Sequence, residues 1–393
     1  MKLQMIIWFS IVTVVCSVGI FFIGRRLIKP MKWKSPYRQI AWTILSAIFL
    51  FPVASMIFTR VWKGNDLLFS WITYVGLGFI SFIFTLLFLR DAVLFLSTLI
   101  QKAVSLFKKE KNLIDPSRRE FLLQSTNIGI IGASALATSY GIYEARKAPG
   151  IVPVDIPIQR LPHAFDGFRI VQISDIHAGL TVDRKWIETV VEEVQKLSPD
   201  LIAFTGDMAD GSVAKLESTV APLGELTAPY GKFFTTGNHE YYSGAPEWIK
   251  HAGVLGYDVL MNEHRAIEKN GAKIILAGVT DYSAGQFFAD QASDPRKAIE
   301  QAPNDMVKIL MAHQPRTLYQ TNGLEYDFVM NGHTHGGQFF PWNYLATFGQ
   351  PFIKGLHRWD KSLVYVSKGT GYWGPPVRLG ARSEITVLTL RKA

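Results

Sequence analysis

Long uncharged apolar runs near the N-terminus constrain the fold of this chain more than any other feature. Three of them occupy residues 5–23, 40–59 and 67–89. Each is long enough to cross a hydrocarbon core of about 30 Å, where a segment must satisfy its own backbone hydrogen bonds. The first quarter of the chain is therefore expected to be helical, with three membrane spans. A cleaved signal peptide fits the first run less well, because dense positive charge follows it instead of a processing site.

Positive charge is concentrated in the same region. Through Arg119 the chain has 16 Lys and Arg against 4 Asp and Glu, whereas the remainder carries a net charge of −3. Nucleic acid is not the natural partner of such a distribution. The loop between the first two runs is the most basic, so the positive-inside rule places it in the cytoplasm and the N-terminus outside. Residues 91–109 mix apolar and polar positions and predict an amphipathic helix on the cytoplasmic face.

A fourth apolar stretch follows a pair of arginines. Residues 117–122 read Ser-Arg-Arg-Glu-Phe-Leu and precede a mildly apolar segment rich in Gly, Ala and Ser. The pattern resembles a twin-arginine export signal, and a basic pair at the cytoplasmic edge of a span is the alternative. Both interpretations predict that residues 121–143 cross outward. Ala135-Leu136-Ala137 could be a processing site, but retention as a fourth span is the simpler expectation after three upstream spans.

Beyond a Pro-containing linker at residues 148–162, the pattern changes to alternating strands and helices. Residues 169–174 form a β-branched run typical of a buried strand, and residues 186–197 have the spacing of an amphipathic helix. Further strands are expected at residues 201–205, 232–236, 273–279, 307–312, 326–330, 363–367 and 384–390. The chain after the linker is therefore expected to form an α/β domain.

Polar side chains follow these strands at the points where they end. In open α/β sheets, binding sites form outside the carboxyl ends of the strands. His333 and His335 stand two residues apart in an extended segment, so their rings project to the same side. The polar residues at these strand ends are Asp175, His177, Asp207, Asn238, His239, His313, His333 and His335.

These side chains favour a site for metal ions. All of them offer oxygen or imidazole nitrogen, and with Cys16 as the single cysteine the chain has neither an intrachain disulfide nor a thiolate cluster. Such a ligand set suits Mn, Fe or Zn, whereas oxygen alone would favour Mg or Ca. Without His239, seven donors remain. They are too many for one tetrahedral ion and suit two divalent ions that share a carboxylate.

The order of these blocks resembles the signature of the calcineurin-like metallophosphoesterases. The resemblance covers roughly residues 168–390 and extends to the membrane-anchored branch of the family with a twin-arginine-type signal. It implies a four-layer α/β/β/α sandwich, preceded here by an all-α transmembrane region, with both metals at one edge. The blocks that carry it are Asp175-Ile176-His177, Gly206-Asp207, Gly237-Asn238-His239-Glu240, His313 and Gly332-His333-Thr334-His335.

The resemblance also implies a role for each donor. Asp207 would bridge two ions about 3.5–4 Å apart, which can share a hydroxide and neutralise the charge that builds during its attack on phosphorus. His239 would protonate the leaving oxygen or stabilise the transition state, or, alternatively, only orient a ligand. Glu240 is expected to be structural. The first ion would be held by Asp175, His177, Asp207 and His335, and the second by Asp207, Asn238, His313 and His333.

Two further sets of residues are candidates for contacts with substrate. Gln338, Arg378 and Arg382 lie in Gly- and Pro-rich segments, where an arginine could grip a phosphate bidentately; surface charges are the alternative. Aromatic residues gather after the motif blocks. They could pack in the core or form an apolar wall for a lipid chain. They include Tyr241, Tyr242, Phe287, Phe339, Phe340, Trp342 and Trp373.

The sequence thus predicts a dimetal phosphohydrolase anchored in the cytoplasmic membrane, with a membrane region (1–116), a signal or fourth anchor (117–147) and an outer catalytic domain (148–393). The expected reaction is that of a phosphodiesterase or pyrophosphatase on a small or lipid-linked phosphate compound, and the expected partners are this substrate and the lipid bilayer. A catalytically silent metal-binding module of the same fold is the alternative. Such a module would lack a metal ligand or the histidine after Asn238, and this sequence has all of them. A dizinc hydrolase of another fold would need an H-x-H-x-D-H block early in the domain, and the sequence has none.

Overall fold

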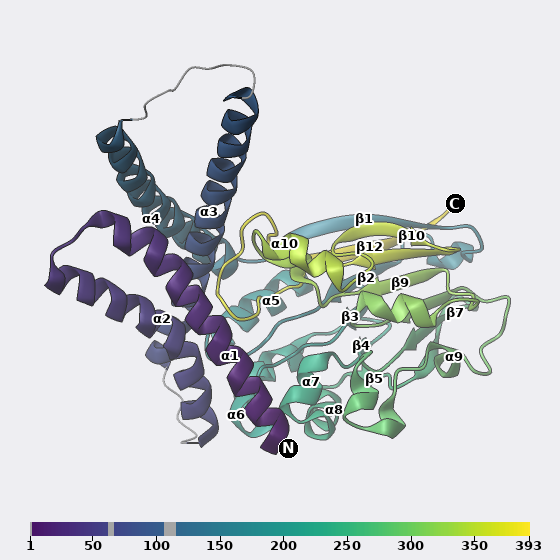
Figure 1. Cartoon of the computed structure of the whole chain (residues 1–393). Helices are drawn as coiled ribbons and strands as arrows, with labels where there is room; N and C mark the ends of the chain where they lie inside the picture. The colour runs from purple at the N-terminus through teal and green to yellow at the C-terminus, as the bar shows by residue number, and fades with distance from the viewer. Residues whose placement is uncertain (1, 62–66, 106–114) are drawn as a thin grey trace. The chain divides into compact units, whose positions relative to one another are not determined.

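The computed structural model of this chain describes residues 2–61, 67–105 and 115–393. Its contacts divide the chain into two compact units, Met1–Gly141 and Ile142–Ala393 (Figure 1). The first unit is helical, whereas the second combines helices with β-sheets. The mixed α/β fold and the helical region before it are confirmed.

Helices make up the described part of the first unit. Among the described residues, two stretches are long and apolar enough to span a membrane, Leu68–Val104 and Ser117–Arg146. The expected first two spans fall in α1 and α2, and their insertion in a membrane stays a prediction. The segments are α1 (Lys2–Ile23), the π-helical turn η1 (Gly24–Ile28), the 3-10 turn η2 (Lys29–Met31), α2 (Ser35–Val61), α3 (Leu67–Ser105) and the first part of α4 (Pro116–Arg146).

One expected boundary between helices is wrong. The sequence predicts a span at residues 67–89 and a separate amphipathic helix at residues 91–109, but α3 runs from Leu67 to Ser105 without a break. No glycine or proline occurs between residues 90 and 105, so nothing in the sequence ends the helix there. Residues 106–109 lie outside the described part of the chain.

A polar network joins three helical segments of the first unit. The Arg26 guanidinium contacts the Asp91 carboxylate, and Arg90 Nη2 donates to Asp91 Oδ1 at 2.8 Å. Asn127 Nδ2 donates to the Arg26 carbonyl oxygen at 3.0 Å. Because Arg26 belongs to η1, Asp91 to α3 and Asn127 to α4, these contacts tie the three segments to one another.

Two six-stranded sheets form the frame of the second unit, all of whose residues the structure describes. One has the order β1-β12-β2-β3-β4-β5 and the other β10-β11-β9-β8-β7-β6. The strands of the first sheet are β1 (Gly150–Ile158), β12 (Glu384–Lys392), β2 (Arg169–Ile173), β3 (Leu201–Phe204), β4 (Lys232–Phe234) and β5 (Asp258–Val259). Those of the second are β10 (Gly355–Trp359), β11 (Ser362–Val366), β9 (Phe328–Asn331), β8 (Lys308–Met311), β7 (Ala272–Gly278) and β6 (Glu263–Lys269).

Parallel pairing in both sheets brings the strand ends to one edge. In the first sheet β2, β3 and β4 run parallel, with Ile173 opposite Phe204 and Phe204 opposite Phe234. In the second sheet β8 is parallel to β7 and β9, with Met311 opposite Met330. The carboxyl ends of neighbouring parallel strands therefore lie side by side.

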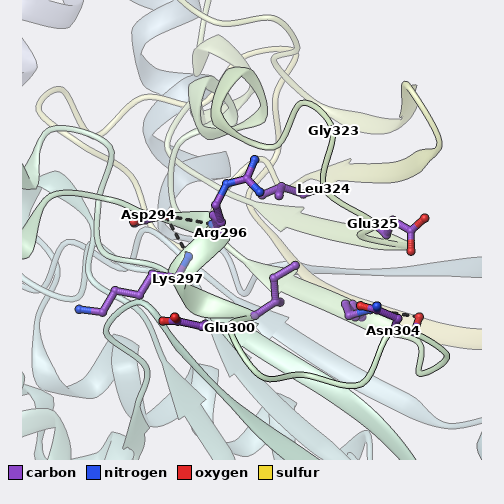
Figure 2. Close-up of a pocket in the computed structure, with 10 residues that line it drawn as sticks. Asp294, Arg296, Lys297, Glu300, Asn304, Gly323, Leu324 and Glu325 are labelled. Atoms are coloured by element: carbon purple, nitrogen blue, oxygen red, sulfur yellow. Dashed lines mark hydrogen bonds between the residues drawn. The ribbon is translucent and has the colours of Figure 1, made fainter.

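The two sheets pack face to face through an apolar core. Ile170 of β2 and Leu201 of β3 belong to this core, together with Ile309 of β8 and Phe328 of β9. On the far face of the second sheet, a separate apolar cluster includes Ala298 of α9 (Pro295–Ala298) and Leu318 of the 3-10 helix η7 (Pro315–Gln320). Near α9 lies a hollow of about 840 Å³ lined by charged side chains of both signs (Figure 2).

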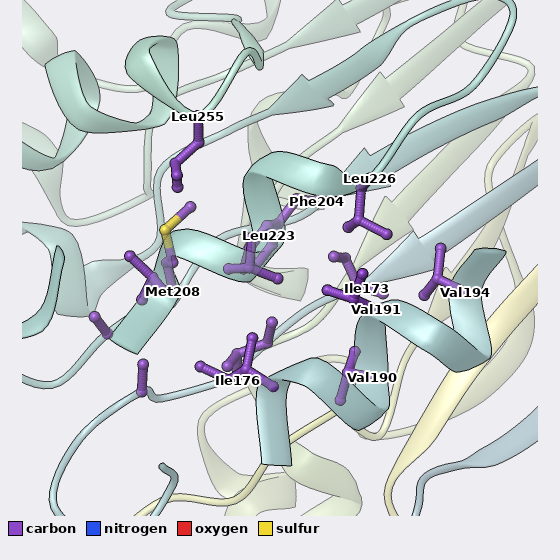
Figure 3. Close-up of a cluster of buried hydrophobic side chains, with 14 of the residues drawn as sticks. Ile173, Ile176, Val190, Val191, Val194, Phe204, Met208, Leu223, Leu226 and Leu255 are labelled. Carbon is purple, nitrogen blue, oxygen red and sulfur yellow. The ribbon is translucent and has the colours of Figure 1, made fainter. Parts of the chain in front are cut away.

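Helices cover the other face of the first sheet. Val171 and Ile173 of β2 point into this layer while Ile170 points between the sheets, so alternate residues of one strand enter different cores. Both faces are buried, which explains why the strands read as continuous apolar runs. Helix α5 (Arg184–Lys196) packs its valines here (Figure 3), and α6 (Val213–Val220) and α8 (Ala245–Val254) complete the layer. The order of layers is helix, sheet, sheet, helix.

The expected linker at residues 148–162 is largely a strand. β1 lies at the edge of the first sheet and pairs with β12 in parallel. Its prolines, Pro153 and Pro157, are four residues apart, so both fall on the same side of the strand. Proline has no N–H to donate. It is tolerated on an edge strand at positions whose nitrogen faces away from the neighbouring strand. The prolines suggested a linker, but they are compatible with this edge position.

Candidate metal centre

All the polar residues expected at strand ends come together at one edge of the two sheets. Loops from the two sheets meet there, since His313 Nδ1, after β8, lies 2.7 Å from the Thr205 carbonyl, after β3. Within the second sheet, Gly332 N–H donates to the His313 carbonyl at 2.9 Å. Asp175 and His177 follow β2, Asp207 follows β3, Asn238 and His239 follow β4, His313 follows β8, and His333 and His335 follow β9.

Asp175, His177 and His335 form a first group of donors. The Nε2 atoms of His177 and His335 are 3.0 Å apart. They lie 4.0 Å and 3.6 Å from Asp175 Oδ1, respectively. All three side chains are buried, so their electron-pair donors face one another away from solvent.

A second group surrounds His313. Its Nε2 atom is 3.1 Å from Asp207 Oδ2 and 3.1 Å from Asn238 Oδ1. His333 approaches through its other ring nitrogen, with Nδ1 at 3.2 Å from the same His313 atom. The four donors expected to hold a second ion thus surround one point.

Asp207 lies between the two groups. Its Oδ2 atom, close to His313, is also 3.6 Å from His177 Nε2 of the first group. The other oxygen, Oδ1, accepts the backbone N–H of His239 at 2.8 Å. One carboxylate oxygen is therefore held by the backbone and the other faces both groups, the position that a bridging ligand requires.

The donor set fits divalent cations. Ligand atoms about 2.1 Å from a tetrahedral ion lie about 3.4 Å from one another, and the separations here range from 3.0 to 4.0 Å. His177 Nδ1 lies 3.0 Å from Asp210 Oδ1, and His313 Nδ1 faces a carbonyl oxygen. When either ring binds a cation, its partner would hold the proton on Nδ1 and leave the Nε2 lone pair directed into the centre.

Several of these residues have a strained backbone. The φ angles of Asp175, His177, Asp207, His333 and His335 are 55°, 52°, 58°, 71° and 51°. Residues other than glycine rarely adopt a positive φ, and each instance costs about 1–3 kcal/mol. Strain of this kind clusters at functional sites. At each position it turns the chain sharply just after a strand, so that the side chain points inward.

Glycine allows the loops to approach closely. A Cβ atom on Gly332 would overlap Ser174 Oγ and Asp175 Oδ2. A Cβ atom on Gly237 would overlap Asp207 Oδ1. The loops after β9 and β4 can therefore contact the loops after β2 and β3 only because these positions lack a side chain.

Asp210 is part of the centre and was missed in the sequence. Its Oδ1 atom is 3.0 Å from His177 Nδ1 and 2.5 Å from His239 Nδ1. His239 is thereby held with Nε2 4.0 Å from Asp207 Oδ2. The only sequence signal was a second carboxylate three positions after Asp207, in a loop where no strand ends.

The electrostatic environment shifts the pKa values of these groups in opposite directions. Burial favours the neutral form of Asp207, but the charges of His313 and His239 hold its pKa well below the usual range. Burial lowers the pKa of His239, yet Asp207 and Asp210 outweigh this effect and raise it to about 9. For His333, burial and the neighbouring His313 lower the pKa to about 3. At neutral pH, His333 is thus a neutral donor while His239 carries a proton.

Glu240 is structural, as expected. Its carboxylate accepts the backbone N–H groups of Asp207 at 3.0 Å, Met208 at 2.7 Å and Gly237 at 2.6 Å. Burial and the nearby Asp207 raise its pKa to about 7. Through these bonds Glu240 ties the loop after β3 to the start of α7 (Asn238–Ser243).

Arg378 is placed differently from the expectation that it grips a phosphate. Its side chain is buried, and its Nη1 atom donates to the carbonyl oxygens of His335 at 2.9 Å, Lys368 at 2.8 Å and Ala381 at 3.1 Å. Nη2 contacts the Gly371 carbonyl and lies 2.9 Å from His335 Nδ1. Because both terminal nitrogens are engaged by the protein, Arg378 orients the ring and loop of His335 rather than facing a substrate.

Gln338 and Arg382 are also engaged elsewhere. Gln338 Nε2 donates to the carbonyls of Trp373 and Pro375, both at 3.0 Å, and its Oε1 accepts the Trp373 N–H at 3.0 Å. Arg382 is exposed and donates to the Ala148 carbonyl at 3.2 Å, beside the start of β1. Neither side chain points into the centre, because each is bound to backbone of a neighbouring segment.

The aromatic residues divide into core and surface. Tyr241 and Phe339 are buried, whereas Tyr242, Phe287, Phe340, Trp342 and Trp373 are exposed. The His239 ring lies 5.2 Å from that of Tyr242 and 5.6 Å from that of Trp373, between centroids. Exposed aromatic side chains therefore adjoin the centre at His239. None of the eight centre residues lines the hollow of Figure 2.

Comparison with known proteins matches this chain to a family and to named relatives. A profile of the calcineurin-like phosphoesterase family matches residues 168–337, a range that contains the eight strand-end residues of the centre and Asp210. A Bos taurus protein named "Transmembrane protein with metallophosphoesterase domain" is 34% identical over 398 residues, which cover 96% of this chain and 87% of the relative. A Danio rerio protein of the same name is 37% identical over 278 residues, covering 69% of this chain and 63% of the relative, which is less than two thirds of its length. Among solved structures, a 5'-nucleotidase precursor from Thermus thermophilus matches with a TM-score of 0.36 and 15% identity, over 56% of this chain and 54% of that one.

Proposed function

The chain belongs to the calcineurin-like phosphoesterase family of metal-dependent phosphoesterases, and on that premise we propose that it is a membrane-anchored dimetal phosphohydrolase. The proposed reaction is hydrolysis of a phosphodiester or pyrophosphate bond in a small or lipid-linked substrate. One observation carries this proposal: Asp207 Oδ2 faces two groups of metal-type donors at once, at 3.6 Å from His177 and 3.1 Å from His313.

The residues of the centre have distinct tasks in such a reaction. When bound, two divalent cations (Mn, Fe or Zn) would neutralise phosphoryl charge and lower the pKa of water. The seven donors Asp175, His177, Asp207, Asn238, His313, His333 and His335 would hold these ions.

His239 would supply a proton to the leaving oxygen. Asp210 holds its Nδ1 atom, which leaves Nε2 turned toward the space beside Asp207. Its ring also contacts exposed aromatic side chains, so a substrate beside Asp207 would meet both the Nε2 atom and an apolar wall. General-acid groups placed in this way contribute a factor of about 10²–10⁴ to the rate.

The membrane setting is part of the proposal. We infer that the helical unit crosses the cytoplasmic membrane several times and that the catalytic unit lies on the outer side. Support comes from the name of the Bos taurus relative, from the two apolar helices α3 and α4, and from the basic residues of the first third. The arginines at 118 and 119 support export through a twin-arginine-type signal.

An assay of the full chain tests the proposed reaction. Protein in detergent, loaded with Mn or Zn and analysed for metal content, is given a bis-aryl phosphate, an aryl phosphate and a lipid pyrophosphate side by side. His239→Ala should lower kcat by about 10²–10⁴ with metal content unchanged. Asp207→Asn should reduce bound metal as well as activity. His163→Ala, an exposed histidine outside the centre, is the matched control and should leave both unchanged.

One result would contradict this function. If the unsubstituted protein binds two metal equivalents but hydrolyses none of the three substrates, the chain is a silent metal-binding module of the same fold.

A further inference from the structure

An uncharged loop rich in aromatic residues follows the metal centre. Between His335 and Lys354 the chain contains no Asp, Glu, Lys, Arg or His. We call residues 338–353 the aromatic loop. Its exposed apolar side chains include Trp342, Tyr344, Leu345 and Phe348, which are 48%, 62%, 49% and 87% exposed. Concentrated exposure of large apolar side chains on one loop indicates a surface that binds a partner.

Both ends of the aromatic loop are fixed to the metal-binding loop. At its start, Gly337 packs so closely on α10 (Trp342–Leu345) that an added Cβ atom would overlap the backbone of Asn343. At its end, Thr334 Oγ1 donates to the Ile353 carbonyl at 2.6 Å. Thr334 stands between the candidate ligands His333 and His335, so the loop has a defined place beside the centre.

Contacts of Gln338 and Trp373 link this loop to His239. Gln338, at the base of the loop, makes hydrogen bonds to both backbone groups of Trp373. Trp373 is 54% exposed and its ring contacts that of His239. The ring of His239 also contacts that of Tyr242, which in turn contacts Phe287 with centroids 5.7 Å apart. A substrate that reaches His239 therefore passes exposed aromatic rings.

The end of the apolar helix α4 belongs to the same part of the catalytic unit. Arg146, the last residue of α4, donates to the Thr181 carbonyl at 2.7 Å. Tyr372 donates to the same carbonyl at 2.7 Å, and the next residue is Trp373. Ala145 is buried in the core that also contains Tyr372. Arg146, at the end of α4 and within this unit, is thus linked through the Thr181 carbonyl to Tyr372, the neighbour of Trp373 in the sequence.

We propose that the aromatic loop, together with Trp373, inserts into the interfacial layer of the lipid bilayer and presents the metal centre to phosphate groups at that surface. This inference rests on the proposed function for the role of the metal centre. Tryptophan and tyrosine rings settle at the headgroup level, and Phe and Leu enter the acyl boundary. The absence of charge over the whole loop removes the main cost of such insertion. A bilayer is the expected occupant because α4 is joined directly to this unit.

Depth measurements on the full chain test the insertion. Cys16 is replaced by Ser, a cysteine is introduced by F348C, and the protein is labelled with an environment-sensitive fluorophore in nanodiscs of zwitterionic lipid. The matched control is E325C, an exposed residue before β9 and hence at the opposite edge of the sheet from the centre. The label at 348 should emit at shorter wavelength and be quenched severalfold more strongly by spin-labelled lipid than the label at 325.

Two outcomes would overturn the proposal at this stage. Equal emission and equal quenching at 348 and 325 would show that the loop stays in water. A shift at 348 that appears only in nanodiscs containing two copies of the chain would assign the surface to self-association instead.

A second measurement connects insertion with turnover. The triple variant W342S/L345S/F348S changes exposed side chains only. It should lower kcat/KM for a lipid-embedded phosphodiester by about tenfold or more, which corresponds to at least about 1.4 kcal/mol, and leave that for soluble bis-aryl phosphate unchanged. Equal losses on both substrates would show that the loop merely supports the metal centre. If the unsubstituted chain hydrolyses neither, the proposed function fails, while the fluorophore still decides whether the loop inserts.

Discussion

Asp210 holds two histidines with one oxygen atom. Because His177 is a candidate ligand and His239 is the candidate acid, a single carboxylate fixes the ring of each through Nδ1. Carboxylates that orient ligand histidines are worth about 10–100-fold in metal affinity or activity. The positions of a candidate ligand, His177, and of the candidate acid, His239, therefore depend on the same side chain.

Replacing Asp210 by Asn should separate this effect from loss of a ligand. We expect Asp210→Asn to retain the fold and to lower kcat by about 10–100-fold, because both rings lose a charged acceptor. Steady-state kinetics and metal analysis give the result. Asp183→Asn, a change to an exposed carboxylate that caps α5, is the control and should leave kcat unchanged. An unchanged kcat in Asp210→Asn would show that Asp210 does not orient the two histidines for catalysis.

Binding of metal should release protons in a manner that depends on pH. The pKa of His239 is raised to about 9 in the metal-free protein, and that of His313 is raised well above its usual value. Binding of a cation by His313 would displace the proton of this ligand, so we expect proton release at pH 7.5 that declines as the pH rises through the raised pKa of His313. His239 is not a ligand and keeps its proton for the leaving oxygen.

Isothermal titration in buffers of different ionisation enthalpy measures this release. His239→Gln should release the same number of protons at pH 7.5, because His239 stays protonated as the general acid. The same raised pKa values stabilise the metal-free fold below about pH 6.5, and that stabilisation is lost as the pH rises toward 9. The absence of proton release at pH 7.5 would contradict these assignments.

The sequence revealed the residues at strand ends but not the residues that support them. Asp175 and His313 were predicted because a buried apolar run stops and a polar residue follows at once. Asp210 lacks that signal, since it lies within a loop. Arg378 was expected near a phosphate, yet the direction of a side chain from a Gly-rich loop depends on contacts that the sequence does not show. In the structure it meets the loop of His335.

At the level of elements, the centre depends on loops that pack against one another after parallel strands. The loop after β9 touches the loop after β2, where His333 N–H donates to Asp175 Oδ1 at 2.9 Å. Gly332 makes this approach possible, because a larger residue would overlap Ser174 and Asp175.

Gly332→Ala should therefore weaken both the fold and the binding of metal. An overpacked position costs about 1–3 kcal/mol, and the displaced Asp175 would no longer meet His335. Gly253→Ala in α8 is the matched control, because a Cβ atom there has no neighbour within 4 Å and alanine favours a helix. Thermal unfolding and metal titration provide the readouts, and equal stability of the two variants would show that the loops can move apart.

Most strands and helices of the second unit can be predicted from the sequence. An edge strand of that unit and a helix boundary in the first unit cannot. Residues 201–205 were predicted as a strand and β3 spans Leu201–Phe204, because its apolar run is short and bounded by polar residues. β1 was missed, because Pro153 suggested a linker and only pairing with β12 shows that an edge strand accommodates it. The junction near residue 90 was expected to separate a span from a surface helix, although helix propensity there is uninterrupted.

For the whole molecule, orientation across the membrane is the property to test. A reporter enzyme that is active only outside the cytoplasm, fused after Ala393, should be active. Changing Arg118 and Arg119 to lysine keeps the charge but removes the arginine pair, so a twin-arginine signal predicts that the reporter loses its outer location. If the double variant stays oriented as before, the pair acts only through its charge. A reporter signal from the cytoplasm would contradict the proposed orientation.

Only three residues separate the end of α4 at Arg146 from the start of β1 at Gly150. If α4 lies in the bilayer, so short a tether prevents the catalytic unit from diffusing into bulk solvent. Encounters with a lipid-borne compound would then occur by lateral diffusion within a leaflet. The rate would follow the mole fraction of that compound among surrounding lipids, and diluting the vesicles in buffer would leave it unchanged.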